Sequence, residues 1–157
     1  MGLTVDLLRE LLQSALVDSG ETKGAIWITV RGDDLSDVVR QLRTHPELRF
    51  DWFVDLCGVD YVPREPRFET VIHLHSMERG HRIRIRCLVP DDSLTVSSLT
   101  PFWPAADWYE REAYDMYGIR FRGHPNLERI LNPPGTTAFP QRKDYPLKGA
   151  RETKEES

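Results

Sequence analysis

The segment Trp108-Tyr109-Glu110-Arg111-Glu112-Ala113-Tyr114-Asp115-Met116-Tyr117-Gly118 predicts a helix with a defined end, and the rest of the chain is organised around it. Its apolar side chains recur at helical spacing, at Tyr109, Ala113, Met116 and Tyr117. Glu112 and Asp115 are three residues apart, so both carboxylates project from another face of the helix. Gly118 follows directly, and glycine is the usual residue where a helix ends in the left-handed conformation.

After Gly118 the chain becomes proline-rich. Five of its eleven prolines follow the helix, so this stretch cannot hold a ladder of backbone hydrogen bonds. Large apolar residues nevertheless recur along it, unlike in a flexible linker. They are Phe121, Leu127, Ile130, Leu131, Phe139, Tyr145 and Leu147. We therefore expect residues 119–147 to form an extended arm whose supporting surface is supplied by a second polypeptide.

The residues before the helix predict alternating helices and strands. We expect a helix from Thr4 to Leu16, with Thr4 as its cap, and a strand from Gly24 to Val30. A second helix is capped by Asp34 and buries Leu35, Val38, Val39 and Leu42. It ends at His45-Pro46, because the residue before a proline is disfavoured in a helix. A further strand begins at Phe50 and reaches Tyr61 at most.

A β-hairpin is predicted from Glu69–Met77 and His81–Val89, with a two-residue turn at Arg79-Gly80. In this register Leu74 is paired with Ile85 on one face and His75 with Arg84 on the other. One face is apolar and the other is polar and basic. The expected fold is therefore α+β: a two-layer, mixed or antiparallel sheet covered by helices on one face, with an extended Pro-rich C-terminal arm. Residues 1–118 would form the globular domain, and residues 148–157 a disordered tail.

The composition narrows the classes of function. A chain of 157 residues is one domain, and a net charge of −4 gives no electrostatic basis for binding nucleic acid or an anionic bilayer. Cys57 and Cys87 lack the spacing of zinc or iron–sulfur ligands, and we expect both to be core residues in a reducing compartment. No apolar run reaches the roughly twenty residues of a membrane helix. Any membrane attachment would therefore be indirect.

Two sets of side chains on the predicted hairpin could bind a ligand. They are the histidines His73, His75 and His81, and the arginines Arg82, Arg84 and Arg86. Histidines at alternate strand positions share a face and could hold a metal ion, but three nearby arginines repel a divalent cation. A solvated or partner-facing polar surface is the favoured interpretation, with anion binding by the arginines as an alternative.

The carboxylates Glu110, Glu112 and Asp115 could act as an acid/base pair. Carboxylates one helical turn apart more often bind an arginine or lysine, so an ion-paired scaffold is favoured, within the chain or across an interface. The candidate partners are Arg111, Arg120, Arg122 and Arg129. The chain has no Gly-x-Ser-x-Gly motif and no phosphate-binding glycine loop, and neither cysteine has an adjacent histidine. The sequence thus predicts no catalytic residue and no metal or cofactor ligand.

Several motifs together carry a resemblance to a known family. They are Gly58-Val59-Asp60-Tyr61, Arg67-Phe68-Glu69, Trp103-Pro104-Ala105-Ala106-Asp107-Trp108, Glu110-Arg111-Glu112, Asp115-Met116-Tyr117-Gly118-Ile119, Gly123-His124-Pro125-Asn126-Leu127, Arg129-Ile130-Leu131 and Arg142-Lys143-Asp144-Tyr145-Pro146-Leu147. Their order and spacing resemble the C-type subunits, the 30 kDa subunit family, of the respiratory NADH:quinone oxidoreductase, complex I.

The resemblance implies a non-redox structural subunit of the peripheral arm of this proton-translocating enzyme. Such a subunit binds the D-type subunit, which is similar to a hydrogenase large subunit, and its C-terminal arm lies along that neighbour. NADH, FMN, the iron–sulfur clusters and quinone belong to other subunits of the complex, at the cytoplasmic face of the inner (plasma) membrane. Carried over by position, the interface residues are Glu110, Arg111, Glu112, Asp115, Gly118, His124, Pro125, Arg129, Arg142, Lys143, Asp144, Tyr145 and Pro146.

Two other functions stay open at this point. Related subunits occur in membrane-bound [NiFe] hydrogenases and formate hydrogenlyases, so the chain could belong to such a complex. A protein of a different class, a stand-alone cytosolic enzyme, could bind a metal or an anion on the predicted face of histidines and arginines.

Overall fold

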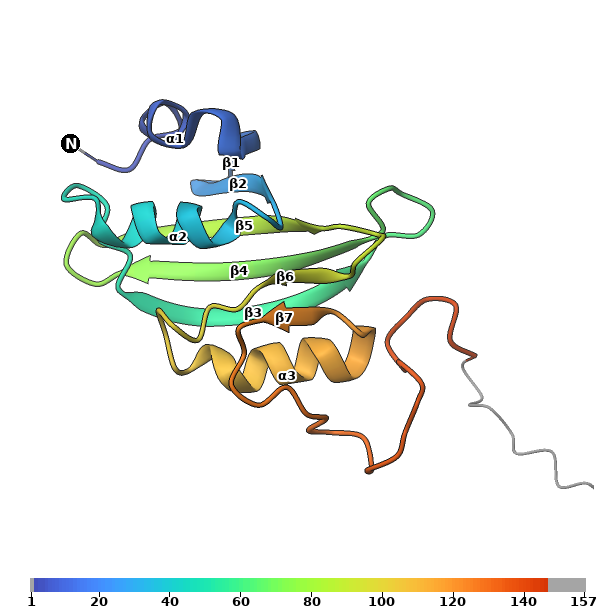
Figure 1. The fold of residues 1–157 in the computed structure, drawn as a ribbon. Helices are drawn as coiled ribbons and strands as arrows, with labels where there is room; N and C mark the ends of the chain where they lie inside the picture. Colours follow the sequence, from blue (N-terminus) through green and yellow to red (C-terminus); the bar gives the residue numbers. More distant parts are fainter. Residues whose placement is uncertain (1, 147–157) are drawn as a thin grey trace, which may run out of the picture.

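A computed structural model describes residues 2–146 of the chain, and Figure 1 shows its fold. The predicted tail at residues 148–157 and Leu147 lie outside the described residues. The elements are α1 (Val5–Leu12), a 3-10 turn (Gln13–Ala15), β1 (Leu16–Thr22), β2 (Ala25–Arg31), α2 (Leu35–Thr44), β3 (Trp52–Asp60), β4 (Phe68–Ser76), β5 (His81–Val89), β6 (Thr95–Ser97), α3 (Ala106–Tyr117) and β7 (Arg120–Arg122).

The described residues form a five-stranded mixed sheet in the order β1-β2-β5-β4-β3 and a two-stranded parallel sheet of β6 and β7. Only the β2–β5 pair of the large sheet is parallel. Figure 1 shows α1 and α2 over the β1–β2–β5 part of this sheet and α3 along β3.

The core lies on one face of the sheet. Its inward positions carry buried residues such as Ile28, Ile72 and Ile85, which belong to the same cluster as side chains of all these helices. The four apolar residues predicted for the second helix are buried in α2. The predicted α+β fold with helices on one face of a mixed sheet is therefore confirmed.

The β4–β5 hairpin has a different register from the predicted one. Ile72 is paired with Ile85 and Leu74 with Ile83, because the connection is the four-residue loop 77–80. A two-residue type I′ turn needs positive φ at both central residues, and only Gly80 of this loop has it. The shift equals two residues, so each side chain keeps its predicted face.

Strand β1 was not predicted, because Asp18, Ser19, Gly20 and Glu21 give it no apolar alternation. It forms by antiparallel pairing with β2 at the edge of the sheet. The predicted first helix is correspondingly shorter and ends at Leu12. Cys57 also differs from expectation: it is exposed on the uncovered face of the sheet, whereas Cys87 is buried.

Helix α3 ends at Gly118, as the sequence predicts, with the glycine in the left-handed region at φ 80°. The segment after it still belongs to the folded body. Ile119 and Phe121 are buried, and residues 120–122 form β7, which pairs with β6. Irregular structure therefore begins at residue 123 rather than at residue 119. Within residues 2–146, no helix combines the length and apolarity needed to span a membrane.

The close approach of α3 to β3 gives a stability prediction. A Cβ atom at Gly58 would lie 2.5 Å from Cδ2 of Tyr117. We expect Gly58→Ala to lower the free energy of unfolding by about 1–3 kcal/mol, because the ring and the strand must separate. Denaturant unfolding of Gly58→Ala, Tyr117→Leu and the double variant measures this. The double variant should lose less unfolding free energy than the two single variants lose together, by at least about 0.5 kcal/mol. Additive losses would show that Gly58 and Tyr117 are not packed against each other.

Candidate functional site

The candidate site is the C-terminal strap, residues 123–146, together with the side chains that bind it to the domain. In Figure 1 the strap leaves β7, passes α3 and ends near the loop between β3 and β4. The strap contains no helix or strand, as its prolines predict. Its conformation is set by contacts with α3, β3 and the neighbouring loops.

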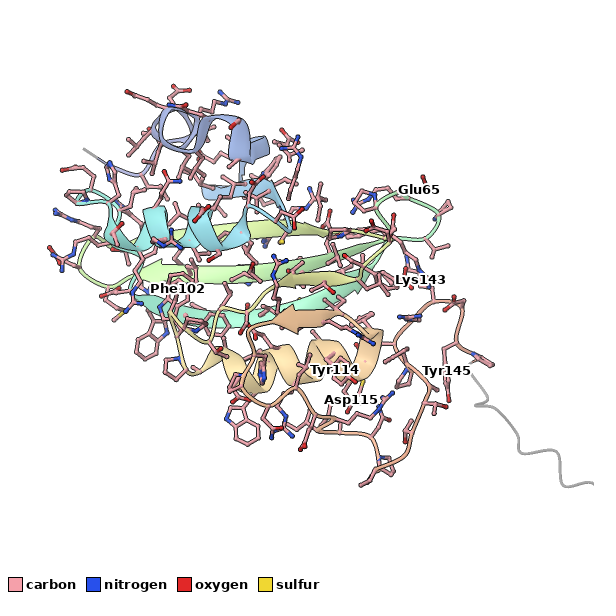
Figure 2. All side chains as sticks on the ribbon, viewed as in Figure 1. Glu65, Phe102, Tyr114, Asp115, Lys143 and Tyr145 are labelled. Carbon is pink, nitrogen blue, oxygen red and sulfur yellow. The ribbon has the colours of Figure 1, made fainter. Side chains whose placement is uncertain are left out.

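Asp115 of α3 is the centre of these contacts. Its buried carboxylate accepts the backbone N–H groups of Ile130, Leu131 and Asn132 at 2.8–3.1 Å. The side chains of Asn132 and Arg129 add hydrogen bonds of 2.8 and 2.7 Å. Figure 2 labels Asp115 on the side of α3 that faces the strap. One carboxylate therefore satisfies three consecutive amide donors and fixes the turn at residues 129–132.

Burial alone would raise the pKa of Asp115. The hydrogen bonds from Asn132, Leu131 and Arg129 outweigh it and hold this pKa well below its usual range. A lowered pKa means that the folded state favours the charged carboxylate. The resulting contribution to stability is complete above the unfolded pKa of about 3.9 and is lost as the pH falls below it.

Arg129 closes the next part of the strap. One nitrogen of its guanidinium, Nη1, contacts Asp115 and also donates to the backbone oxygen of Ala138 at 3.0 Å. The guanidinium lies over the ring of Phe139, 5.0 Å from its centroid. Residues 130–137 thus form a loop that one arginine holds at both ends.

Glu110 binds a different part of the chain. Its buried carboxyl accepts the hydroxyl of Ser98 and the backbone N–H of Leu99 in the segment between β6 and α3. The buried side chain of His124 lies beside it, with Nε2 4.0 Å from the carboxyl and 3.2 Å from the backbone oxygen of Asp107. Burial raises the pKa of Glu110 to about 7, against the hydrogen bonds from Leu99 and Ser98.

The far end of the strap is bound to β3 and the β3–β4 loop. Arg142 donates from Nε to the backbone oxygen of Tyr117, and its guanidinium lies between the rings of Phe68 and Phe139. The backbone N–H of Lys143 donates to Asp60 at 2.8 Å. Arg67 joins Asp60 to Asp144. The hydrogen bonds from Arg67 are the main reason that the pKa of Asp60 is lowered.

The structure divides the predicted interface residues into two groups. Most of them contact their own chain: Glu110, Arg111, Asp115, Gly118, His124, Arg129, Arg142 and Asp144. The remaining residues are Glu112, Pro125, Lys143 and Pro146, which are exposed, and Tyr145, which is partly buried. Of these, Lys143 also contacts its own chain, through its backbone N–H. The expectation that a second polypeptide supplies the surface for the whole arm needs correction, because the domain itself supplies much of that surface.

The pairing of the helix carboxylates also differs from the prediction. Glu112 and Asp115 were expected to project from one face of the helix, but Glu112 is exposed, and the buried carboxylates are Glu110 and Asp115. Sequence reasoning did not assign Asp60, Arg67 or Ser98 to the site. Asp60 and Arg67 lie within the family motifs quoted above, and their place in these motifs was the sequence signal that could have assigned them to the site.

The predicted set of histidines is not assembled. His73 and His75 point to the uncovered face of the sheet, whereas His81 lies opposite Ser76 on the inward side. His73 is bonded to Asp55 and to Arg84. No group of three His, Cys, Asp or Glu side chains that could hold a metal ion occurs in the described part of the chain.

Fold and site together define a class: a small α+β domain with a C-terminal strap that buried carboxylates bind to it. Comparison with known proteins gives the family. The family described as respiratory-chain NADH dehydrogenase, 30 Kd subunit, matches residues 28–151, and the chain belongs to it. The resemblance found in the sequence is thereby confirmed.

Two relatives and two solved structures show the extent of the similarity. The C-type subunit of NADH-quinone oxidoreductase from Roseiflexus sp. (strain RS-1) is 48% identical over 148 residues, covering 94% of this chain and 84% of the relative. The second C-type subunit from Rhizobium meliloti (strain 1021) is 45% identical over 138 residues, covering 88% and 75%. A trypsin-resistant fragment (1-134) of Nqo5 matches with a TM-score of 0.68 and 27% identity, covering 78% of this chain and 97% of the fragment. The membrane-bound sulfane sulfur reductase, an archaeal respiratory membrane complex, shares the fold with a TM-score of 0.75 and 24% identity, covering 90% and 85%.

The contacts of Asp115 give a testable prediction. Asp115→Asn removes the charge and places an N–H₂ group among amide donors, so the variant should lose about 2–4 kcal/mol of unfolding free energy. Trypsin should also cut faster after Arg129, because the turn is released. Glu112→Gln, on the exposed side of the same helix, is the matched control. Equal stability and equal cleavage of the two variants would contradict the assigned role of Asp115.

The raised pKa of Glu110 predicts a pH dependence. The folded state favours the protonated carboxyl, so its contribution to stability is complete below pH 4.5 and is lost as the pH rises through about 7. Glu110→Gln mimics the protonated form. We expect the unfolding free energy of the parent to fall relative to this variant, by up to about 3 kcal/mol across that range. Denaturant titrations at several pH values measure it, and Glu112→Gln should keep the parental slope.

Proposed function

We propose that this chain is a structural, non-redox subunit of the peripheral arm of NADH:quinone oxidoreductase (complex I). We further propose that it binds the D-type subunit, the neighbour similar to a hydrogenase large subunit, which we call the hydrogenase-like subunit. Its role is to assemble the quinone-reducing part of the complex. Membership of the 30 kDa subunit family supports the complex, and one feature of the surface supports the mode of binding.

That feature is an apolar surface along the first half of α3 and the strap. Trp108 is 61% exposed, Leu131 62% and Tyr109 37%. Arg111 joins the two segments: its guanidinium lies over Trp108, 5.2 Å from the ring centroid, and donates to the backbone oxygens of Glu128 and Arg129. The helix and the strap therefore present one continuous surface.

Exposed apolar patches mark interaction sites, and tryptophan, tyrosine and arginine are enriched among the residues that carry most of the binding energy. The strap is already ordered by Asp115 and Arg129 before any partner binds. Docking consequently costs less conformational entropy than the folding of a free arm would. This preorganisation supports binding of the strap surface to a neighbouring subunit.

The contacts made by the polar side chains support a non-redox role for this subunit. The carboxylates and arginines of the strap are bonded within the chain, so they stabilise this surface. We infer that NADH, FMN, the iron–sulfur clusters and quinone are held by other subunits, and that this chain holds no cofactor. The chain would lie at the cytoplasmic face of the inner (plasma) membrane, attached through its partners.

Two alternatives are less well supported. The archaeal respiratory complex shares the fold, which fits an equivalent subunit of a membrane-bound hydrogenase or formate hydrogenlyase. The 48% identity to a C-type subunit of NADH-quinone oxidoreductase favours complex I. A stand-alone metal enzyme would need ligands that converge, and His73 and His75 are separated from His81 by the sheet.

The proposed interface can be tested by truncating its anchors. Trp108→Ala combined with Leu131→Ala should weaken binding to the hydrogenase-like subunit by at least about tenfold, because both side chains lose their contact area. The readout is the ratio of the hydrogenase-like subunit to this chain in complexes purified from membranes by a tag on this chain.

Val17→Ala combined with Met77→Ala is the matched control, since both residues are exposed and neither belongs to α3 or the strap. This control should assemble like the parent. In denaturant titrations, both double variants should have the same unfolding free energy as the parent to within about 0.5 kcal/mol. Normal assembly of the Trp108/Leu131 variant would refute this binding surface.

A further inference from the structure

The face of the five-stranded sheet opposite the helices is uncovered and carries large apolar side chains among its basic ones. We call it the open face; most of its outward side chains come from β2, β3, β4 and β5. They include Ala25, Trp27, Trp52, Cys57, Val59, Val71, His73, His75, Arg82, Arg84 and Arg86. A sheet face in contact with water normally carries polar residues at these positions. The exposed apolar side chains on this face, Trp52 and Val54, therefore indicate a surface for a partner.

Two adjoining hollows make a groove across this face. One, of about 370 Å³, is lined by Trp52, Val54 and Arg82 among others, and the second, of about 610 Å³, by Trp27 and Val71 among others. His73 and Arg84, which are hydrogen-bonded to each other, line both hollows, so the two adjoin at this pair. Trp27 is held beside the groove by a hydrogen bond from its indole to Thr22.

The charges along the groove are not balanced. Two carboxylates on this face are already used: Asp55 contacts His73, and buried Glu69 accepts hydrogen bonds from Arg86 and Arg64. Arg84 donates from Nε to Nε2 of His73, a neutral acceptor if Nδ1 carries the proton toward Asp55. Among residues 2–146, no carboxylate forms an ion pair with the exposed guanidinium of Arg82 or Arg84.

We propose that this groove binds a helix of a second partner protein. The apolar stripe of this helix packs on the groove, and carboxylates beside the stripe face Arg82 and Arg84. The two arginines are two residues apart on one strand, which separates them by about 7 Å. Carboxylates three or four residues apart on a helix are about 5–6 Å apart, so two flexible arginine side chains can reach both.

A helix suits this surface better than a strand. The inner strands already pair on both sides, so an extended segment crossing the face would form no backbone ladder with them. Sheet faces are covered by helices, whose apolar stripe packs on the outward side chains. The surface differs from the α3 and strap surface, which lies on the helix-covered side. The proposed second partner therefore does not use the surface proposed for the hydrogenase-like subunit.

A native cysteine reports on this coverage. Cys57 lines the larger hollow and is exposed, whereas Cys87 is buried in the core. Partial burial in the hollow raises the pKa of the Cys57 thiol. Because the thiolate is the reactive form, labelling with iodoacetamide is best measured at an alkaline pH of about 8.5. We expect Cys57 to react at least about tenfold more slowly in the complex purified from membranes than in the isolated chain. Equal rates would overturn the proposal.

A photo-cross-linker identifies what covers the groove. Val54 is exposed at the edge of the smaller hollow, and benzoylphenylalanine at this position, in the full chain assembled in cells, should cross-link to a helical segment with at least two Asp or Glu residues. Mass spectrometry of the cross-linked peptide gives its sequence. A cross-link only to a second copy of this chain, to lipid or to a segment without carboxylates overturns the proposal, as does the absence of a cross-link.

Charge reversal tests the role of the arginines. Arg82→Glu with Arg84→Glu should lower the cross-link yield at least about fivefold while the hydrogenase-like subunit still co-purifies. Arg9→Glu with Arg40→Glu makes the same charge change on α1 and α2, at exposed residues away from the groove, and should leave the yield unchanged to within about twofold. An unchanged yield in the Arg82/Arg84 variant overturns the assigned contact. In the chain without these substitutions, a normal cross-link without co-purification of the hydrogenase-like subunit would count against the proposed function alone.

Discussion

The structure of the C-terminal half depends on one buried charge. A carboxylate removed from water must find hydrogen-bond donors within the protein, and Asp115 finds five, three of them consecutive backbone amides. Those amides belong to a proline-broken segment that has no ladder of its own. The same contact thus gives donors to the buried carboxylate of the helix and an acceptor to the unpaired amides of the strap. It makes an irregular segment an ordered part of the surface.

This arrangement separates the polar and apolar groups of the strap and of helix α3. Arg129 and Arg142 reach inward to backbone oxygens and aromatic rings, whereas Trp108 and Leu131 remain outside. A surface built in this way is rigid and partly apolar before it meets a partner. The domain has a second uncovered region on the other side of its sheet, so this chain offers two separate surfaces on opposite sides of one small core.

Much of the fold could be predicted from local patterns, and much of the site could not. The buried stripe of α2, the end of α3 at Gly118 and the two faces of the β4–β5 hairpin follow from periodicity and from glycine chemistry. Strand β1 escaped prediction because its sequence is polar and only pairing with β2 makes it a strand. The ion pair of Asp115 with Arg129 was among the predicted pairings and is confirmed. The backbone and hydroxyl partners of Glu110 and Asp115 escaped prediction because they lie 11–17 residues away in the chain, and spacing along one helix does not identify such partners.

The double contact of Arg129 has an evolutionary consequence. Since this residue bonds Asp115 and the backbone oxygen of Ala138, the loop 130–137 is fastened at its base. Insertions, deletions or substitutions near Pro134 and Gly135, which are exposed, would leave both fastenings in place. Members of the family could therefore remodel this tip for different neighbours while retaining the same scaffold beneath it.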